Sequence, residues 1–349
     1  MKLSASWLIK IKAVYIPLKH AVLKVISLSS WFSSIYYGLC SPSFRREQRA
    51  VVSGLKRHME LIRNDASFFL LRRNAHRLEK GLVMPKRKPI FALEYIGETV
   101  TYYENCLRSG AAVCDREEFK WAGDILKLYF ASVASNPIIE RARRKFFGIV
   151  DEQTVGQRVP YLRGTGESPV STEDLLALAK RRKSVRVFLQ KPVPHALLDE
   201  ALKIAALAPS SCNRQPVHYR FYDQPELLRE LAAMPLGTAG FADNIPMICV
   251  LTGDLSAYFY ERDRHSIYVD GCLSAMLFML ALESVGLASC PLNWPEIDRL
   301  DSKLETLIKL PAYERAILFM AVGYADPDGL VACSQKKDLS ELRSYNRVG

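Results

Sequence analysis

The sequence predicts a chain of two parts, a mostly helical first half and a second half in which helices and strands alternate. Between residues 48 and 150, Leu, Ile, Phe and Tyr recur every three or four residues, which is the spacing of amphipathic helices. From residue 170 onward, short apolar runs typical of buried strands alternate with helical patterns. Residues 151–170 lose this periodicity and collect Gly, Pro and polar residues, so we expect a linker there.

Helical periodicity in the first half is clearest over residues 54–62, 92–107 and 119–133, and Pro85 and Pro89 bracket a basic loop. In the second half, Ser171 or Thr172 caps a predicted helix that opens with acidic residues, and Pro194 starts another. The second half is predicted to contain helices at 171–184, 194–208, 225–234, 266–286 and 297–310, and strands at 217–223, 246–253, 287–294 and 315–325. The helix at 266–286 is apolar around nearly its whole circumference, so we expect it in a core or a subunit interface.

The composition is that of an ordinary globular protein. The chain has 349 residues, of which 49% are hydrophobic and 24% are charged, so it is long enough for two domains and is not disordered as a whole. The cysteines show no CxxC pair or zinc-like spacing, which disfavours a metal site or a disulfide framework and indicates a cytoplasmic setting. The sequence contains neither a GxGxxG nor a P-loop motif, which argues against a Rossmann or P-loop nucleotide site.

Positive charge is concentrated in the first half. Residues 1–168 contain 28 Lys and Arg against 15 Asp and Glu, and the first 46 residues contain seven basic side chains and no acidic one. Lysines interrupt the early apolar run and serines fill the uncharged run 25–44, so neither a signal peptide nor a membrane span fits. We expect residues 1–46 to form a basic amphipathic segment on an anionic membrane surface, which would make the protein peripheral to the membrane. The candidate anchors are Trp7, Ile11, Tyr15, Trp31 and Phe32.

The alternative for this segment is a helix that packs its apolar stripe on the protein itself. Nucleic-acid binding is not expected, because no recognised reader motif accompanies the basic residues. We therefore divide the chain into the basic segment 1–46, a helical region 47–165 with its linker at about 151–170, and a second domain at 170–349.

Four stretches of the second half combine residues that suggest a ligand site. The first is "KRRKSVRVF" (180–188), where guanidinium groups flank a hydroxyl, although basic residues at a helix end also simply complement the helix dipole. The second is "ALAPSSCNRQPVHYRF" (206–221), in which five small or polar side chains lie between two prolines at the junction of a helix and a strand. The third is the long apolar helix followed by "LASCPLNW", and the fourth is "VGYADPDGLVACSQKKDLSEL" (322–342).

In their order and spacing, these four stretches resemble the nitroreductase family of FMN-dependent oxidoreductases, over about residues 170–345. The resemblance implies an α+β sandwich, with a mainly antiparallel sheet flanked by helices, in an intertwined homodimer that shares two FMN sites. It also implies NADPH or NADH as the electron donor and a small organic molecule as the acceptor. The first half does not belong to the core of that family.

The resemblance also assigns site residues. Arg182, Ser184 and Arg186 would bind the FMN phosphate and ribityl chain, with at most a backbone contact from Lys183, and Lys336 or Lys337 would complete the phosphate site. The isoalloxazine ring would be bordered by the partner's loop and by the strand after the long helix, through Pro209, Ser210, Ser211, Asn213, Gln215, Pro291, Leu292 and Asn293. Asn213 and Gln215 would fix that loop, and a backbone N–H near Asn293 or Trp294 would face the reactive flavin N5.

No side chain is nominated as a catalytic acid or base, because the flavin carries the hydride chemistry. Two departures from the family pattern matter. Asn293-Trp294 stands where the family often has Glu-Gly, so we expect the indole to narrow the substrate pocket. Lys336 stands where members commonly have arginine and lacks the bidentate fork of that side chain. We expect Asp270 to cap or orient the long helix.

The predicted function is an FMN-dependent NAD(P)H oxidoreductase that reduces a small organic acceptor by ping-pong hydride transfer. One alternative is a specialised flavin dehydrogenase or oxidase in a biosynthetic pathway such as cell-surface polysaccharide synthesis. The other is a non-catalytic adaptor that keeps the flavin fold and acts through the basic first half.

Overall fold

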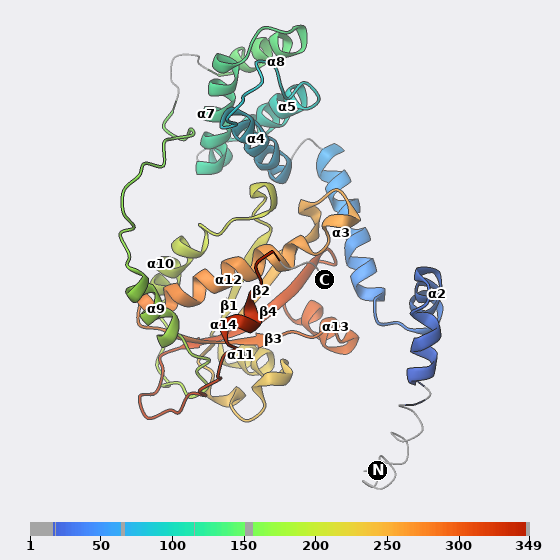
Figure 1. The fold of residues 1–349 in the computed structure, drawn as a ribbon, viewed down its shortest axis with the longest axis vertical. Coiled ribbons are helices and arrows are strands. Elements are labelled where there is room, and N and C mark those ends of the chain that lie inside the picture. The colour runs from blue at the N-terminus through green and yellow to red at the C-terminus, as the bar shows by residue number, and fades with distance from the viewer. Residues whose placement is uncertain (1–16, 18, 64–66, 115, 151–155, 347–349) are drawn as a thin grey trace.

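The computed structural model describes residues 17, 19–63, 67–114, 116–150 and 156–346, and within them it shows a helical first half and a second half built on a sheet (Figure 1). We refer to residues 45–150 as the helical region and to residues 171–346 as the sheet region. The elements of the first half are α2 (Ser30–Ile35), the π-helical turn η1 (Tyr36–Cys40), α3 (Arg45–Arg63), α4 (Phe68–Leu82), α5 (Ile96–Arg108), α6 (Ala111–Cys114), α7 (Glu117–Ser132) and α8 (Pro137–Phe147).

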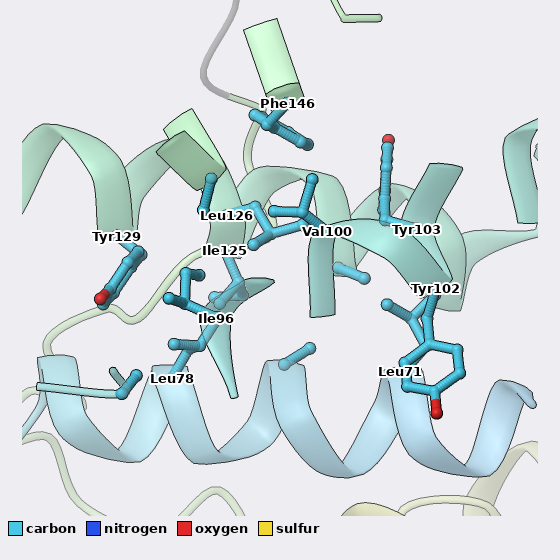
Figure 2. Packing of buried hydrophobic residues seen from close by; sticks show 14 of the residues in the cluster. Leu71, Leu78, Ile96, Val100, Tyr102, Tyr103, Ile125, Leu126, Tyr129 and Phe146 are labelled. Carbon is cyan, nitrogen blue, oxygen red and sulfur yellow. The ribbon is translucent and has the colours of Figure 1, made fainter. Parts of the chain in front are cut away.

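The helical region has a core of its own. Leu and aromatic side chains of α4, α5, α7 and α8 converge on one buried cluster, seen from close by in Figure 2. Leu78, Val100, Ile125 and Leu126 have no exposed surface in this cluster. The apolar spacing in the sequence therefore predicted a real helical bundle, because each helix turns its apolar stripe toward the other three.

The sheet region matches the predicted order of elements. It consists of α9 (Thr172–Arg181), α10 (His195–Ala205), η2 (Ser211–Asn213), β1 (Val217–Tyr222), α11 (Pro225–Ala232), η3 (Leu236–Thr238), η4 (Ala242–Asn244), β2 (Met247–Asp254), η5 (Leu255–Ala257), η6 (Glu261–Asp263), α12 (Ser266–Ser284), β3 (Ala288–Asn293), α13 (Asp298–Leu307), β4 (Glu314–Gly323) and α14 (Leu339–Leu342). The strands form one antiparallel sheet in the order β1-β2-β4-β3. The α+β sandwich is thus confirmed.

Both faces of the sheet are covered, as the alternation of side chains along β2 shows. Ile248 and Val250 point into a cluster with α11 and α13, whereas Met247, Cys249 and Leu251 point into a cluster with α10 and α12. The continuous apolar character of β2 follows from this arrangement, because a strand buried on both faces cannot alternate with polar residues.

The stretch Glu261–Ser284, which contains α12, is the one helix among the described residues that is long and apolar enough to cross a membrane by length and composition. Half of its apolar window is buried inside the molecule, against α10 and the sheet. On its buried side this helix lies in the core of the sandwich, which is one of the two placements that the sequence predicted.

The two regions meet where α3 crosses onto the sheet region (Figure 1). A Cβ atom at Gly54 would lie 2.7 Å from the Cβ of Leu255, so only glycine allows α3 to approach η5 this closely. Nδ1 of the buried His58 lies 2.6 Å from the carbonyl oxygen of Ser256. Near the start of α3, Arg46 forms an ion pair of 2.6 Å with Glu305 of α13.

α3 begins at Arg45, so the predicted boundary after residue 46 falls in its first turn. Residues 156–170, the described part of the predicted linker, contain no helix or strand. Before α3, Leu28, Trp31 and Leu39 are each more than three-quarters exposed. The candidate anchors Trp7, Ile11 and Tyr15 lie outside the described residues.

Candidate cofactor site

A strip of cationic and hydroxyl side chains lies along the start of β3. α9 ends at Arg181, and Arg182 leaves the helix with a ψ of 114°, which turns the chain into an extended path. Ser184 then forms a parallel bridge with Ser289, and the N–H of Val185 donates to the Ser289 carbonyl at 3.1 Å. This pairing brings Ser184 to β3, with Arg182 and Arg186 two residues away on either side.

Two groups beside this strip lack hydrogen-bond partners within the described residues. Nε of Arg182 and Oγ of Ser289 are both buried and unpaired. Arg186 is exposed, and one of its terminal nitrogens donates to the Ser184 carbonyl at 3.2 Å. Buried polar groups are normally paired, so an unpaired hydroxyl and an unpaired guanidinium N–H in the same strip as Arg186 fit a phosphate well. We call Arg182, Ser184, Arg186 and Ser289 the cationic strip.

A cavity of about 790 Å³ is lined by Gln190 and by residues 233–236 and 238–244. The Arg186 guanidinium lies 6.0 Å from the ring centre of Phe241, which lines this cavity. Oδ1 of Asn244, also in the lining, accepts a hydrogen bond of 2.6 Å from the N–H of Phe188. The volume is typical of a small-molecule site. Sequence reasoning missed Phe241, Asn244 and Ser289, since they reach the strip only through tertiary packing.

The segment after β4 begins close to the cationic strip, but the last basic motif, further along this segment, does not lie on the strip. After β4, Ala325 bridges Phe188, and the N–H of Leu189 donates to the Tyr324 carbonyl at 2.9 Å. Lys336 and Lys337 lie further along this tail, where both are exposed, and the structure records no contact between them and the strip in the same chain. Lys183, between Arg182 and Ser184, is half-buried.

The loop at 209–215 has an unusual backbone. Cys212, Asn213 and Gln215 adopt φ angles of 51°, 52° and 50°, a left-handed region that is costly for residues other than glycine. Hydrogen bonds inside the loop hold this conformation: the Gln215 N–H donates to Oγ of Ser210 at 3.0 Å, and Nε2 of Gln215 donates to Oδ1 of Asn213 at 3.2 Å. Such concentrated strain is typical of a ligand site.

Asp270 anchors the same loop from α12. One of its oxygens accepts from the Ser211 N–H and from the Tyr258 hydroxyl, each at 3.0 Å. Burial raises the pKa of Asp270, while these two donors and Arg214 oppose the rise. The expected capping role is wrong, because Asp270 lies inside α12 rather than before its first turn. Its carboxylate orients the loop instead.

The residues of β3 are divided between core and surface. Leu292 is buried in the cluster beneath the sheet, Pro291 is half-buried, and Asn293 is exposed. Trp294 is only 6% exposed: its ring stacks on Phe319 at 4.5 Å, and its Nε1 donates to Oδ1 of Asp301 at 2.9 Å. The expectation that this indole narrows a substrate pocket is therefore wrong, since it fills the core.

Within one chain, the loop and the cationic strip belong to opposite ends of the sheet. In the strip, Ser184 pairs with Ser289, and the partner of Ser289 in β4 is Val322, near the end of that strand. The loop leads into Val217, which pairs with Gly253 at the far end of β2. A ligand of FMN size that contacts both would therefore need the loop of a second copy.

Comparison with known proteins agrees with the fold. The family model described as "Nitroreductase family" matches residues 179–239 and 223–324. The chain is 24% identical to an iodotyrosine deiodinase of Drosophila melanogaster over 53% of this chain and 74% of that protein. It is 25% identical to an NADH dehydrogenase of Thermus thermophilus over 47% of this chain and 92% of that protein.

Two further matches have similar extents. A 4-nitrobenzoate reductase of Pseudomonas putida is 24% identical over 46% of this chain and 89% of that protein. A solved FMN-dependent nitroreductase from Clostridium difficile R20291 is 23% identical and covers 50% of this chain and 99% of its own, with a TM-score of 0.42.

The fold and the family match define the second half of the chain as an oxidoreductase domain. Residues 179–324 belong to the nitroreductase family, and the helical region before them lies outside the match.

Proposed function

We propose that this protein is an FMN-dependent NAD(P)H oxidoreductase that reduces a small organic acceptor. When bound, FMN would supply hydride transfer between NADPH or NADH and the acceptor. The observation that carries the proposal is the cationic strip, where Arg182 Nε and Ser289 Oγ lie buried and unpaired inside a nitroreductase-family domain. These donors suit the phosphate of the cofactor.

The chain's own residues would bind and orient the cofactor. Arg182 and Arg186 neutralise the phosphate, and the Ser184 hydroxyl is placed between them. Asp270 holds the Ser211 backbone, which keeps the loop of one copy rigid against the ring held by the other. The exposed Asn293 and the backbone N–H that follows it end β3, where the resemblance implies a donor to flavin N5.

A homodimer is part of this proposal. α12 leaves Val269, Cys272, Leu273 and Met276 exposed on one side, at the spacing of a single helix face. A second copy would cover this stripe. It would also place its own loop at 209–215 beside the cationic strip, because the loop and the strip of one chain lie at opposite ends of the sheet.

The test is the absorption spectrum of the pure protein before and after addition of NADPH or NADH. We expect a yellow dimer with flavin bands that nicotinamide bleaches. A yellow protein that neither nicotinamide bleaches would favour the dehydrogenase or oxidase alternative. A colourless protein that does not take up added FMN would favour the adaptor.

Replacing Arg182 and Arg186 by alanine should release FMN, because each charged contact to a phosphate contributes about 1.5–3 kcal/mol. Lys180→Ala is the matched control: Lys180 is an exposed cation in the last turn of α9. Unchanged FMN affinity in the double variant would contradict the phosphate assignment.

We also propose that the segment before α3 lies on an anionic membrane surface. Trp31 is 76% and Phe32 is 50% exposed, and α2 stands apart from the sheet (Figure 1). Lysines accompany these apolar side chains and no acidic residue precedes Glu47, so the segment is complementary to anionic lipid.

Sedimentation with vesicles of phosphatidylcholine and phosphatidylglycerol tests this placement. The full chain should pellet with the vesicles, and Trp31→Ser with Phe32→Ser should reduce the pelleted fraction. Ile138→Ser removes an equally exposed apolar side chain from α8 and should have no effect. Equal pelleting of all three proteins would count against membrane contact through this segment.

A further inference from the structure

Four arginines gather where α4 of the helical region touches the loop at 209–215. Arg72 donates from a terminal nitrogen to the carbonyl of Arg214 at 2.6 Å. Arg214 is 7% exposed, donates to the Ser211 carbonyl at 3.1 Å, and lies 5.0 Å from the ring centre of Tyr258. Burial lowers the pKa of Arg73, and the nearby Arg77 and Arg214 lower it further. We call Arg72, Arg73, Arg77 and Arg214 the arginine cluster.

Negative charge in the vicinity does not balance this cluster. Glu118 pairs with Arg72 at 3.1 Å, but in the part of the chain that the structure describes no ion pair joins Arg73, Arg77 or Arg214 to a carboxylate. Asp270, the carboxylate of the loop, already accepts two hydrogen bonds. Glu98 lies near Arg73 and accepts a hydrogen bond from Tyr102 at 3.0 Å. Half-buried and buried cations without counterions are costly, and an anion bound among them would offset that cost.

A pocket of about 240 Å³ opens beside the cluster. Arg72 is the member of the cluster that lines this pocket, together with Ser210, Gln215, Tyr219 and the carboxylate of Asp270. Two of these residues, Ser210 and Gln215, belong to the strained loop. The pocket is large enough for a carboxylate or phosphate group with a few attached atoms.

The arginine cluster is separate from the predicted site of the FMN phosphate. The cationic strip, which includes Ser289, lies at one end of the sheet, whereas the loop lies at the opposite end. In the proposed dimer, this loop borders the flavin ring rather than its phosphate. The cluster therefore lies beside the place where an acceptor would meet the ring.

From these contacts we infer that α4 and the loop at 209–215 form a binding site for an anionic group, a phosphate or a carboxylate, carried by the acceptor. The inference rests on the proposed function, because the flavin makes this loop an edge of the active site. It also gives the helical region a role: it supplies Arg72, Arg73 and Arg77 to a substrate site that the family domain alone does not contain.

The first experiment measures the anion site without turnover. Inorganic pyrophosphate is titrated calorimetrically into the full chain saturated with FMN, so that the phosphate site of the cofactor is filled. We expect binding that Arg73→Gln and Arg77→Gln each weaken about tenfold or more, the usual effect of losing a charge-assisted hydrogen bond. Lys80→Gln, at an exposed position of the same helix, should bind as the wild type does.

The second experiment assigns the site to the acceptor or to the nicotinamide donor. 4-Nitrobenzoate and 4-nitrobenzamide have nearly the same shape but differ in charge. The ratio of their kcat/KM values should favour the anion and should fall about tenfold in Arg73→Gln, while bleaching by NADPH keeps its rate.

Three outcomes would overturn the inference. If pyrophosphate binds the Arg73, Arg77 and Lys80 variants equally, the arginines only join the two regions. If Arg73→Gln slows bleaching and leaves the acceptor ratio unchanged, the cluster binds the donor. If the wild type shows no preference for nitrobenzoate, the acceptor does not use the site. A colourless protein would defeat the proposed function, yet a pyrophosphate titration of the FMN-free chain and of its Arg73 and Arg77 variants would still decide whether the anion site exists.

Discussion

The helical region and the sheet region bury their apolar side chains to different degrees. In the helical region, α4, α5, α7 and α8 close completely around side chains such as Leu126, which has no exposed surface (Figure 2). In the sheet region, the longest helix leaves Val269 58% and Leu273 46% exposed. In the proposed homodimer, the core of α4, α5, α7 and α8 would be complete in one copy, whereas a second copy would cover the exposed face of α12.

The largest expected effect tests the closed core. Leu126→Ala should lower the free energy of unfolding by about 2–5 kcal/mol, because it leaves a cavity that a packed helical bundle cannot fill. Urea unfolding followed by circular dichroism measures the loss. The control is Ile138→Ala, because Ile138 of α8 is 48% exposed. This variant should lower the free energy of unfolding by less than about 1 kcal/mol. Equal losses at the two positions would show that the helical region is not closed.

The next effect tests the open face of α12. Leu273→Lys should weaken dimerisation about 100-fold or more, because the variant would bury an unpaired charge at the interface. Sedimentation equilibrium measures the association, and FMN should dissociate together with the dimer. Ile138→Lys changes a side chain of nearly equal exposure in the helical region and should leave the mass unchanged. A dimer that tolerates Leu273→Lys would place the interface elsewhere.

A smaller effect arises at the junction of the two regions. Burial raises the pKa of Asp254, just before η5, to about 6, although the Ser256 N–H donates to its carboxylate at 2.7 Å. A raised carboxyl pKa means that the folded state holds the proton more tightly than the unfolded chain does. Stability from this group is therefore fully present below about pH 4 and is lost as the pH rises to 6.

Asp254→Asn keeps an acceptor for the Ser256 N–H and removes the charge. At pH 7, we expect the variant to unfold at a higher urea concentration than the wild type, with a free energy of unfolding that is larger by about 1–2 kcal/mol. At pH 4, the two proteins should have the same free energy of unfolding. Urea midpoints at the two pH values measure this. An advantage of equal size at both pH values would show that the cause is not ionisation.

The smallest effect concerns the tie between α3 and α13. Arg46 contacts Glu305 and Ser302, and Arg46→Ala should cost about 1 kcal/mol, since the ion pair is only partly buried. Faster hydrogen exchange of α3 amides, with α7 amides unchanged, would report local loosening. Arg49→Ala, an exposed position on the same helix, is the control. Unchanged exchange in Arg46→Ala would mean that the contacts of Gly54 and His58 with η5 hold α3 without this ion pair.

The order of helices and strands could be predicted from the sequence because their signals are local. β2 is a continuous apolar run and α9 begins at the Ser171 cap, which accepts from the Asp174 N–H. The crossing of α3 onto the sheet could not be predicted in the same way. It depends on Gly54 meeting Leu255, about two hundred residues away in the chain.

The candidate site was predictable only in part. Arg182, Ser184 and Arg186 could be predicted to lie together because they share one short motif, and Ser184 pairs with Ser289 of β3. The role of Trp294 was misjudged, because its hydrogen-bond partner Asp301 lies in the next helix and draws the ring into the core. Arg72 was missed, since its contact with Arg214 joins two regions that carry no common sequence signal.

The central claim is that one FMN is held by the cationic strip of one copy and the loop of another. A mixture of two defective proteins tests it most directly: Arg182→Ala with Arg186→Ala in one, and Ser211→Trp in the other, each carrying a different tag. Neither protein alone should bind FMN, whereas dimers purified through both tags should bind it at about one of their two sites. Mixed dimers that remain colourless would contradict the account. So would either of the two variant proteins if it kept its flavin when purified alone.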